Sequence, residues 1–211
     1  MVEYTYESRS RWAVFWSFPC CASRWERGAT HVRIQAITIS GEVATGKSSL
    51  ADAVIALLPG WKGVHTGQRF RAFSAARGLS IQQVSLLPDD VHQAFDTAQR
   101  QLLETTSHIV VEGRLAGWLA HGLDAVLKVY CSAPFAVRVE RYMRREQVSR
   151  AQAEAEIAYR DSRDVEKYHR LYGVPDYRAS GWYDLQVDTS THTPAELAQH
   201  VLKAMQERIA L

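Results

Sequence analysis

Cysteine is scarce in this sequence, and long hydrophobic runs are absent. The three cysteines among 211 residues are Cys20, Cys21 and Cys131, and their odd number and spacing fit neither a disulfide framework nor a metal site. No apolar run approaches the roughly 20 residues that a membrane-spanning helix needs. We therefore expect a cytoplasmic protein with no membrane partner.

A strong net charge is also missing. The 25 Lys and Arg residues nearly balance 23 Asp and Glu residues, which gives a formal charge of +2. This balance is unlike that of a protein that coats nucleic acid, so we expect no nucleic-acid partner. With 46% hydrophobic and 23% charged residues, the composition is typical of a globular domain and excludes fibrous or wholly disordered classes.

From Val32 onward, short β-rich runs alternate with amphipathic helical segments. The patterns predict strands at 32–40, 61–67, 108–113, 125–132 and 184–190, and helices at 48–58, 68–78, 80–87, 89–104, 134–172 and 193–210. Thr193 and Glu196 have the spacing of a capping box at the start of the last helix. The alternation predicts an α/β fold, a parallel five-stranded sheet flanked by helices on both faces.

The sequence GEVATGKS, from Gly41 to Ser48, matches the phosphate-binding pattern G-x-x-x-x-G-K-[ST] between a predicted strand and a predicted helix. Backbone N–H groups of such a loop, together with the helix N-terminus, bind phosphate oxygens. Lys47 is expected to reach the β- and γ-phosphates of ATP, and Ser48 to offer its hydroxyl to Mg²⁺. Glu42 is expected to point to solvent, because the backbone forms the cradle. The residues expected to bind ATP are Gly41, Glu42, Val43, Ala44, Thr45, Gly46, Lys47, Ser48 and Ser49.

Residues 1–31 show neither helical nor strand periodicity, although they hold three of the six tryptophans. A basic start, a short apolar centre and small residues give them a superficial likeness to a secretion signal, but a nucleotide loop follows directly. We expect an N-terminal extension at 1–31 that is poorly ordered, or a misassigned start with translation beginning near Val32. Residues 32–211 are then expected to form one domain.

The predicted strand at 108–113 ends in Glu112, and Arg114 follows on the next turn. In P-loop proteins a carboxylate on a second strand orders Mg²⁺ or its water, and Glu112 is the candidate here. Arg114 is expected at the same edge of the sheet, where ligands bind in open α/β folds. Five histidines, at 65, 92, 108, 121 and 169, have no metal-ligand spacing and are expected to be structural or solvated.

The segments ITISGEVATGKSS, HTGQRFRA, VVEGRLAGWLA, YRDSRDVEKYHRLYG and YDLQVDTS occur in the order expected of cytidylate kinases. The chain resembles the shorter, archaeal-type members of that family, and the likeness covers residues 32–211. The P-loop alone is generic, whereas its combination with EGRLAG and RDSRD is much more specific. The resemblance implies a P-loop kinase fold with a helical lid at about 141–164, which transfers a phosphoryl group from ATP to CMP or dCMP.

The resemblance also implies roles for residues at matching positions. Thr66 and Arg71 would line the pocket of the acceptor monophosphate, and Arg114 would bind the acceptor nucleotide. Longer, bacterial members carry an aspartate directly after that arginine, where this chain has Leu115. A base contact from that position is therefore not carried over.

The sequence RDSRD matches the R-x-x-R-D pattern of the lid and its flank, with Arg160, Arg163 and Asp164 at the matching positions. Asp164 and Arg160 are expected to bind substrate. A further arginine of bacterial members is replaced by Lys167 here. Arginine stabilises a transferring phosphoryl group bidentately. The expected catalytic residues are Lys47, Arg114, Arg160 and Arg163.

Between Arg138 and Arg170 there are nine basic and seven acidic residues. Most such charges form a solvated helical face, and we expect Arg141, Arg145, Arg160 and Arg163 to be the ones that act. The sequence offers no obvious general base, which fits a phosphate acceptor, because a phosphate monoester with a second pKa of about 6 is already an oxyanion near neutral pH.

Two other interpretations stay open. The same scaffold could phosphorylate another nucleotide or a small metabolite, since fold does not fix substrate. A non-catalytic nucleotide-binding module would bind ATP without acceptor-dependent ADP release, and it would survive an Arg114→Ala change. We expect the protein to be a monomer.

Overall fold

The centre of the molecule is a sheet of five parallel strands. The computed structural model describes residues 33–76, 78 and 87–209. In this part of the chain the strands are β1 (Ala36–Gly41), β2 (Lys62–His65), β3 (Ile109–Glu112), β4 (Val126–Ser132) and β5 (Leu185–Asp188). Their order in the sheet is β2-β3-β1-β4-β5, and every neighbouring pair is parallel. The predicted five-stranded parallel sheet is confirmed.

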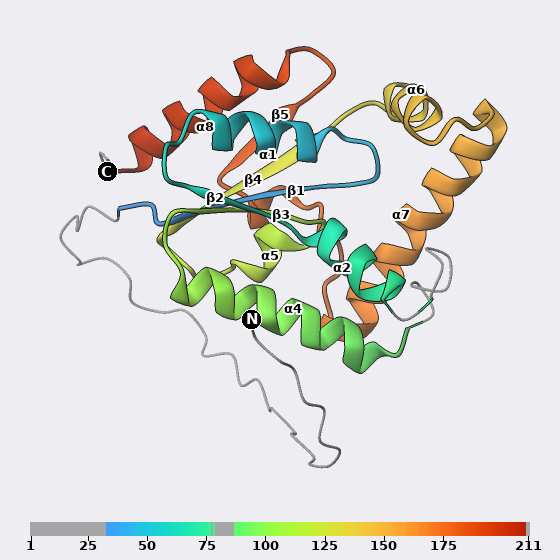
Figure 1. Cartoon of the computed structure of the whole chain (residues 1–211), viewed down its shortest axis with the longest axis horizontal. Helices are drawn as coiled ribbons and strands as arrows, with labels where there is room; N and C mark the ends of the chain where they lie inside the picture. The colour runs from blue at the N-terminus through green and yellow to red at the C-terminus, as the bar shows by residue number, and fades with distance from the viewer. Residues whose placement is uncertain (1–32, 77, 79–86, 210–211) are drawn as a thin grey trace. The chain divides into compact units, whose positions relative to one another are not determined.

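Helices cover both faces of this sheet (Figure 1). One face packs against α1 (Lys47–Ala56) and α8 (Pro194–Ile209), and the other against α4 (Asp89–Thr105) and the short α5 (Ala116–Leu119). β1 and β3 are buried along their whole length, which explains their continuous runs of apolar and β-branched residues. Each fully buried Ile, Leu or Val contributes roughly 1.5–3 kcal/mol to folding.

Several element boundaries differ from the sequence prediction. α2 (Thr66–Ala75) begins directly after β2, so Thr66, which falls within the predicted strand segment at 61–67, is the first residue of a helix. The α5 helix was not predicted. The capping box of α8 is confirmed, because the Thr193 N–H donates to Glu196 Oε2 and the Glu196 N–H to Thr193 Oγ1. The N-terminal extension and most of the predicted helix at 80–87 lie outside the described residues.

The predicted helical stretch at 134–172 is two helices, α6 (Phe135–Glu146) and α7 (Arg150–Tyr172). Gln147, whose φ of 57° is left-handed, caps the C-terminus of the first helix, and Ser149 caps the N-terminus of the second. Ser149 and Gln152 form a reciprocal capping box, so the pattern S-x-x-Q marks a break that periodicity alone had bridged.

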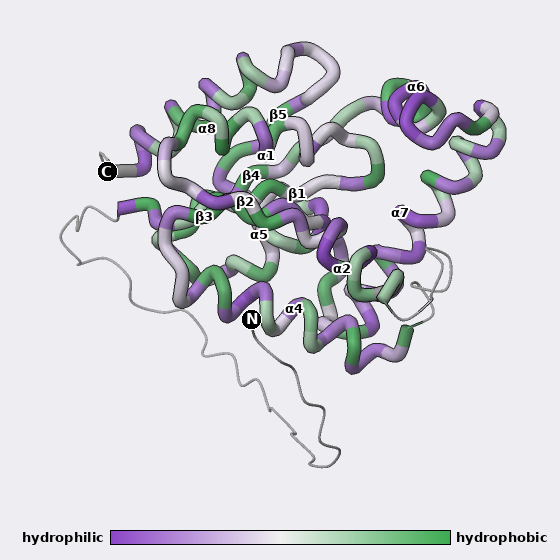
Figure 2. The backbone as a smooth tube through the Cα atoms, viewed as in Figure 1, coloured by the Kyte–Doolittle hydropathy of each residue, from purple (hydrophilic) through white to green (hydrophobic). Residues whose placement is uncertain are grey.

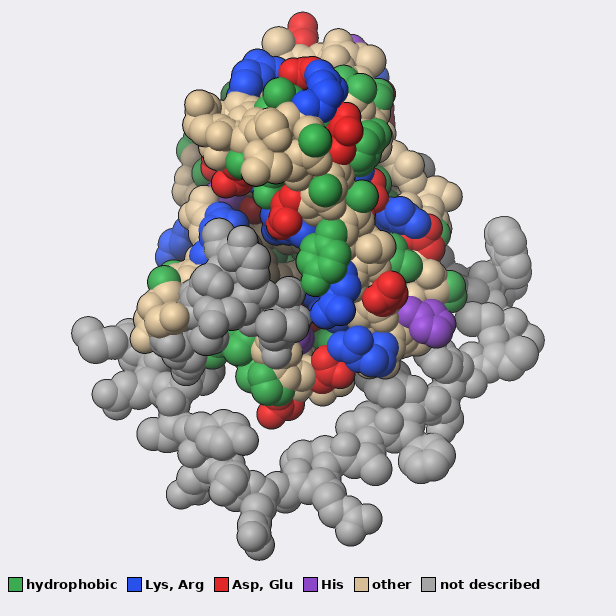
Figure 3. Space-filling view, turned by 90° about the vertical axis from the view of Figure 1, so that its right-hand side faces the viewer, with side chains coloured by type: hydrophobic (Ala, Val, Ile, Leu, Met, Phe, Trp, Pro, Cys, Tyr) green, Lys and Arg blue, Asp and Glu red, His purple; other side chains and the backbone are tan. Residues whose placement is uncertain are grey.

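The two helices, called here the α6–α7 pair, lie at the edge of the sheet where the strands end (Figure 1). Both are largely hydrophilic (Figure 2). Figure 3 looks onto this side of the molecule, and basic and acidic side chains are interspersed over it instead of forming one basic patch. None of the described helices is long and apolar enough to cross a membrane.

Candidate functional site

The loop between β1 and α1 lies at the carboxyl edge of the central strand and depends on glycine. Gly41 has a φ of 153°, and a Cβ atom there would lie 2.6 Å from the Cys131 carbonyl oxygen and 2.6 Å from Thr45 Oγ1. Gly46, which precedes α1, has a φ of 84°. Ala44 also adopts a left-handed φ, of 58°. These positive φ values produce the sharp turns that the motif predicts.

Lys47 occupies the first position of α1 and its ammonium group turns back over the loop. Lys47 Nζ donates to the Glu42 carbonyl oxygen at 3.2 Å and lies 3.7 Å from Glu112 Oε1. Burial lowers the pKa of Lys47 to about 8, and the Glu112 carboxylate opposes this shift. Ser48 and Ser49 follow in the first turn of α1 and are exposed. The strand order thus brings Lys47 and Glu112 together, as expected.

His65 joins this group, although the sequence offered no reason to select it. Its Nδ1 lies 3.2 Å from Glu112 Oε2, and its Nε2 lies 3.2 Å from Asp52 Oδ1 on α1. The sheet explains the contact, because His65 and Glu112 are partners in the β2–β3 register. Both residues lie near the ends of predicted strands, which was the available signal. To predict their contact, one also had to know that the two strands are neighbours in the sheet.

Glu42 does not point to solvent, contrary to the sequence expectation. It accepts a hydrogen bond from Arg178 Nη1 at 3.3 Å and lies 3.6 Å from Arg138 Nη1. Buried Arg138 also donates to the Val43 carbonyl oxygen at 3.2 Å and to Asp161 Oδ2 at 2.7 Å. The Val43 N–H in turn donates to Asp161 Oδ1 at 3.4 Å. The negative charge is therefore compensated within a network that joins the loop to the α6–α7 pair.

A second contact to the loop comes from the chain after β5. Thr189 Oγ1 donates to the Thr45 carbonyl oxygen at 2.5 Å. Arg141 of α6 donates from Nη1 to Thr189 Oγ1 at 2.8 Å and from Nη2 to the Thr189 carbonyl oxygen at 2.6 Å. A Cβ atom on Gly46 would lie 3.4 Å from Arg141 Nη1. Arg141, expected from sequence to act, therefore lies directly beside the loop.

Arg114 lies between β3 and α7, beside two of the residues that the RDSRD segment contributes. It forms an ion pair with Asp164, and its Nη1 lies 3.5 Å from the Arg160 carbonyl oxygen. Burial, and then the positive charge of Arg114, lower the pKa of Arg160. Lys167 Nζ lies 3.2 Å from Asp164 Oδ1. Arg163, in contrast, is exposed and lies over the Tyr159 ring at 5.9 Å, so the structure does not bring it into this group.

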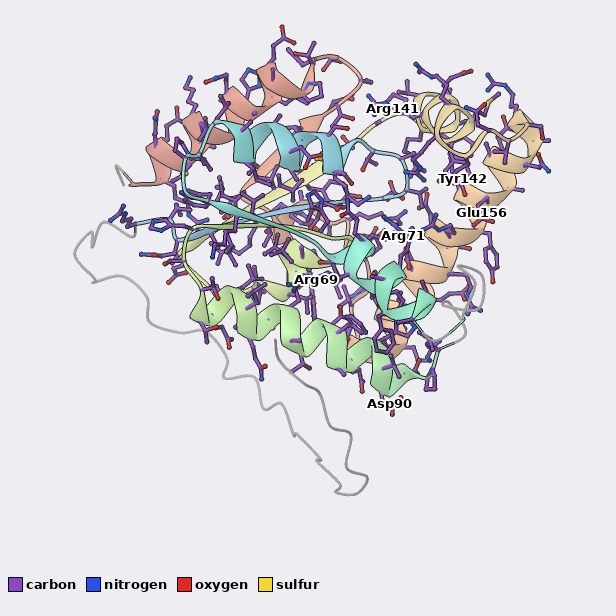
Figure 4. All side chains as sticks on the ribbon, in the orientation of Figure 1. Arg69, Arg71, Asp90, Arg141, Tyr142 and Glu156 are labelled. Atoms are coloured by element: carbon purple, nitrogen blue, oxygen red, sulfur yellow. The ribbon has the colours of Figure 1, made fainter. Side chains whose placement is uncertain are left out.

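Two further expected residues, Thr66 and Arg71, are on α2. Thr66 Oγ1 donates to Gln99 Oε1 of α4 at 2.6 Å, next to Gly113. Arg71 is exposed, and Figure 4 shows it on the side of α2 turned toward α7, with Arg69 on the opposite side. Arg145, on α6, lies over the Tyr142 ring at 5.1 Å and pairs with Glu146, and its positive charge is one of those that lower the pKa of Lys47.

The residues around the loop can accommodate Mg²⁺ only together with other oxygen ligands. Within the described ranges, no group of three or more His, Cys, Asp or Glu residues is placed to hold a metal ion. Mg²⁺ in phosphoryl-transfer sites is commonly held by one or two protein oxygens together with water and substrate phosphates. The Ser48 hydroxyl and the Glu112 carboxylate, both oxygen donors, fit that pattern.

Comparison with known proteins identifies the family. A family model described as the cytidylate kinase-like family matches residues 63–191, well over half of the chain. The chain belongs to this family. A cytidylate kinase of Pyrococcus abyssi is 35% identical over 161 residues, which cover 75% of this chain and 86% of that protein. One of Halobacterium salinarum is 33% identical over 172 residues, which cover 80% of this chain and 88% of that protein.

The solved structures show the fold. Shikimate kinase from Acinetobacter baumannii superposes with a TM-score of 0.57 at 16% identity, covering 83% of this chain and 95% of that chain.

Within this cytidylate kinase-like chain, Leu115 is buried in an apolar cluster with Tyr168 and Tyr177. That position therefore contributes packing. Lys167, at the position where the resemblance led us to expect an arginine in bacterial members, contacts Asp164.

Proposed function

We propose that this protein transfers the γ-phosphoryl group of ATP to CMP or dCMP, giving ADP and CDP or dCDP. The observation that carries the proposal is the meeting of two basic groups at one edge of the sheet. Lys47 belongs to the phosphate loop, and the Arg114–Arg160 pair lies between β3 and α7. The curated relatives named cytidylate kinases support the choice of acceptor.

On the donor side, the loop from Gly41 to Ser48 binds the ATP phosphates and Lys47 contacts the β- and γ-phosphates. The Lys47 ammonium is buried and already largely desolvated, which is why its pKa is near 8. The arriving phosphates hold it in the charged form. The Ser48 hydroxyl and Glu112 hold Mg²⁺ or its water. When bound, Mg²⁺ neutralises charge on the β- and γ-phosphates. His65, fixed by Asp52, orients the Glu112 carboxylate.

On the acceptor side, Arg71 and Arg114 bind the monophosphate, with Thr66 beside them. Arg114 is held by Asp164 in the free protein, so the guanidinium is already oriented when the phosphate arrives. An oxygen of the acceptor phosphate forms a bond to the γ-phosphorus as the bond to the ADP oxygen breaks. Arg160 stabilises the charge that spreads over the transferring group. No general base is needed, because the acceptor is already an oxyanion.

The α6–α7 pair acts as the lid over both nucleotides, with Arg141 beside the donor loop and Arg160 beside Arg114. Closure of such a helical pair excludes water, which would otherwise hydrolyse ATP. Arg163 must change its position to act, because its side chain is exposed and lies over the Tyr159 ring.

The test is ADP release by the full chain with ATP, Mg²⁺ and, in parallel, CMP, dCMP, UMP, AMP, GMP and small metabolites that carry a hydroxyl group. Fastest turnover with CMP or dCMP supports the proposal. Fastest turnover with a hydroxyl acceptor, or ATP binding with no acceptor-dependent ADP release, would overturn it and favour a metabolite kinase or a nucleotide sensor.

A further inference from the structure

One face of α4 carries polar side chains into the molecule. His92, Asp96 and Gln99 are spaced by four and three residues and therefore share a side of the helix. His92 and Gln99 are only 8% and 7% exposed, and Nε2 of each has no hydrogen-bond partner among the described residues. A buried polar group without a partner lowers stability. Such a group at a substrate site is explained if the substrate supplies the partner.

Of these two side chains, Gln99 has a fixed orientation. Its Oε1 accepts a hydrogen bond from Thr66 Oγ1 at 2.6 Å. Gly113 packs against the same pair, because a Cβ atom there would lie 3.0 Å from Thr66 Oγ1 and 3.5 Å from Gln99 Oε1. Gly113 immediately precedes Arg114, so the Gln99 amide lies close to the proposed acceptor site.

The hydrogen bond runs from the Thr66 hydroxyl to the oxygen end of the Gln99 amide. With Oε1 occupied by the Thr66 hydroxyl, the unpaired end is the NH₂ group, a hydrogen-bond donor. Cytosine and uracil differ at N3, which is a lone-pair acceptor in cytosine and carries a proton in uracil. A fixed donor facing N3 pairs with cytosine and opposes the N–H of uracil.

We propose that Gln99 reads the base of the acceptor nucleotide by donating from Nε2 to N3 of cytosine, with Thr66 holding the amide in this orientation. The inference rests on the proposed function, and it adds the residue that separates CMP from UMP. A site built to hydrogen-bond its substrate rejects an analogue that leaves a buried group unpaired.

The test compares kcat/KM for CMP and for UMP, at saturating ATP, in the wild type and in Gln99→Leu and Gln99→Glu. Gln99→Leu removes the donor and should lower the CMP-to-UMP ratio about tenfold. Gln99→Glu places a carboxylate acceptor at the same position and should shift the ratio further, toward UMP. Gln101, exposed on the other side of α4, provides the matched controls Gln101→Leu and Gln101→Glu, which should keep the wild-type ratio.

Thr66→Val tests the orientation separately. It removes the hydroxyl that fixes the amide, so the CMP-to-UMP ratio should fall even though Gln99 is present. Thermal melts of every variant establish that the protein is folded. A general packing defect would lower kcat/KM for both nucleotides equally and leave their ratio unchanged.

Failure of this inference is distinguishable from failure of the proposed function. If the wild type phosphorylates CMP but folded Gln99→Leu and Gln99→Glu keep the wild-type ratio, Gln99 does not read the base and the proposed function stands. If the wild type phosphorylates neither CMP nor dCMP, the proposed function is overturned and the inference with it.

Discussion

The proposed donor and acceptor sides of the site differ in how fully their polar groups are paired. Around the phosphate loop, Glu42 contacts two arginines, the Val43 N–H has a carboxylate acceptor, and Thr189 bonds to Thr45. On the acceptor side, Arg71 is exposed and Gln99 keeps an unpaired buried amide. The difference fits a proposed donor site that is preorganised. In the proposed acceptor site Arg114 is already held by Asp164, whereas Gln99 would find its partner only in the substrate.

The largest effect is expected from Lys47→Ala on the donor side. Removing the cation that contacts the transferring phosphoryl group should lower kcat about 10³-fold. Steady-state ADP release measures it. Lys203→Ala, an exposed lysine of α8, is the control and should retain wild-type activity. Equal activity of the two variants would contradict the assignment of the loop.

Arg138→Ala should break the preorganisation of the donor side. The buried Asp161 carboxylate would lose its ion-pair partner, so the free energy of unfolding should fall by about 3 kcal/mol. Urea denaturation measures this loss. Arg150→Ala removes an exposed pair with Glu140 and should cost no more than about 0.5 kcal/mol. Similar losses in both variants would show that the network does not stabilise the loop.

Arg114→Ala should weaken binding of the acceptor while leaving binding of ATP almost unchanged. Loss of a charged hydrogen bond to the acceptor phosphate should raise the KM for CMP about 30-fold. The dissociation constant of ATP, measured without CMP by titration calorimetry, should change little. A comparable loss of ATP affinity would mean that Arg114 belongs to the donor side.

A smaller effect is expected from pH on the acceptor side. Burial lowers the pKa of His92 to about 4, whereas an unfolded histidine has a pKa near 6.5. Between those values the unfolded chain binds a proton that the folded chain does not, so stability should fall as pH is lowered through this window. The slope should reach at most about 1.4 kcal/mol per pH unit. Urea titrations of His92→Leu should lose this part of the slope, while exposed His169→Gln should keep it.

The sequence was sufficient for the sheet, for the phosphate loop and for the position of Glu112 at the edge of the sheet where the loop lies. These features follow from local motifs and from the rule that parallel strands end at one edge. The contacts of Glu42 and the Val43–Asp161 bond were not predictable, because the latter joins residues 118 positions apart. The contacts of His65 and Gln99 were not predicted for the same reason, since their partners are on other elements whose arrangement had to be known. The break between α6 and α7 was readable at Ser149 and was missed.

The contacts of the phosphate loop also have a consequence for how such loops can be exchanged. In the motif, the four positions between Gly41 and Gly46 are unrestricted. Here Glu42 is held by arginines, and Val43 and Ala44 pack in one apolar cluster with side chains of the α6–α7 pair. A loop transplanted from an unrelated P-loop protein would keep the glycines and the lysine and would lose these attachments. Residues at the unrestricted positions of this motif thus contact the proposed lid, and the two segments are expected to change together in evolution.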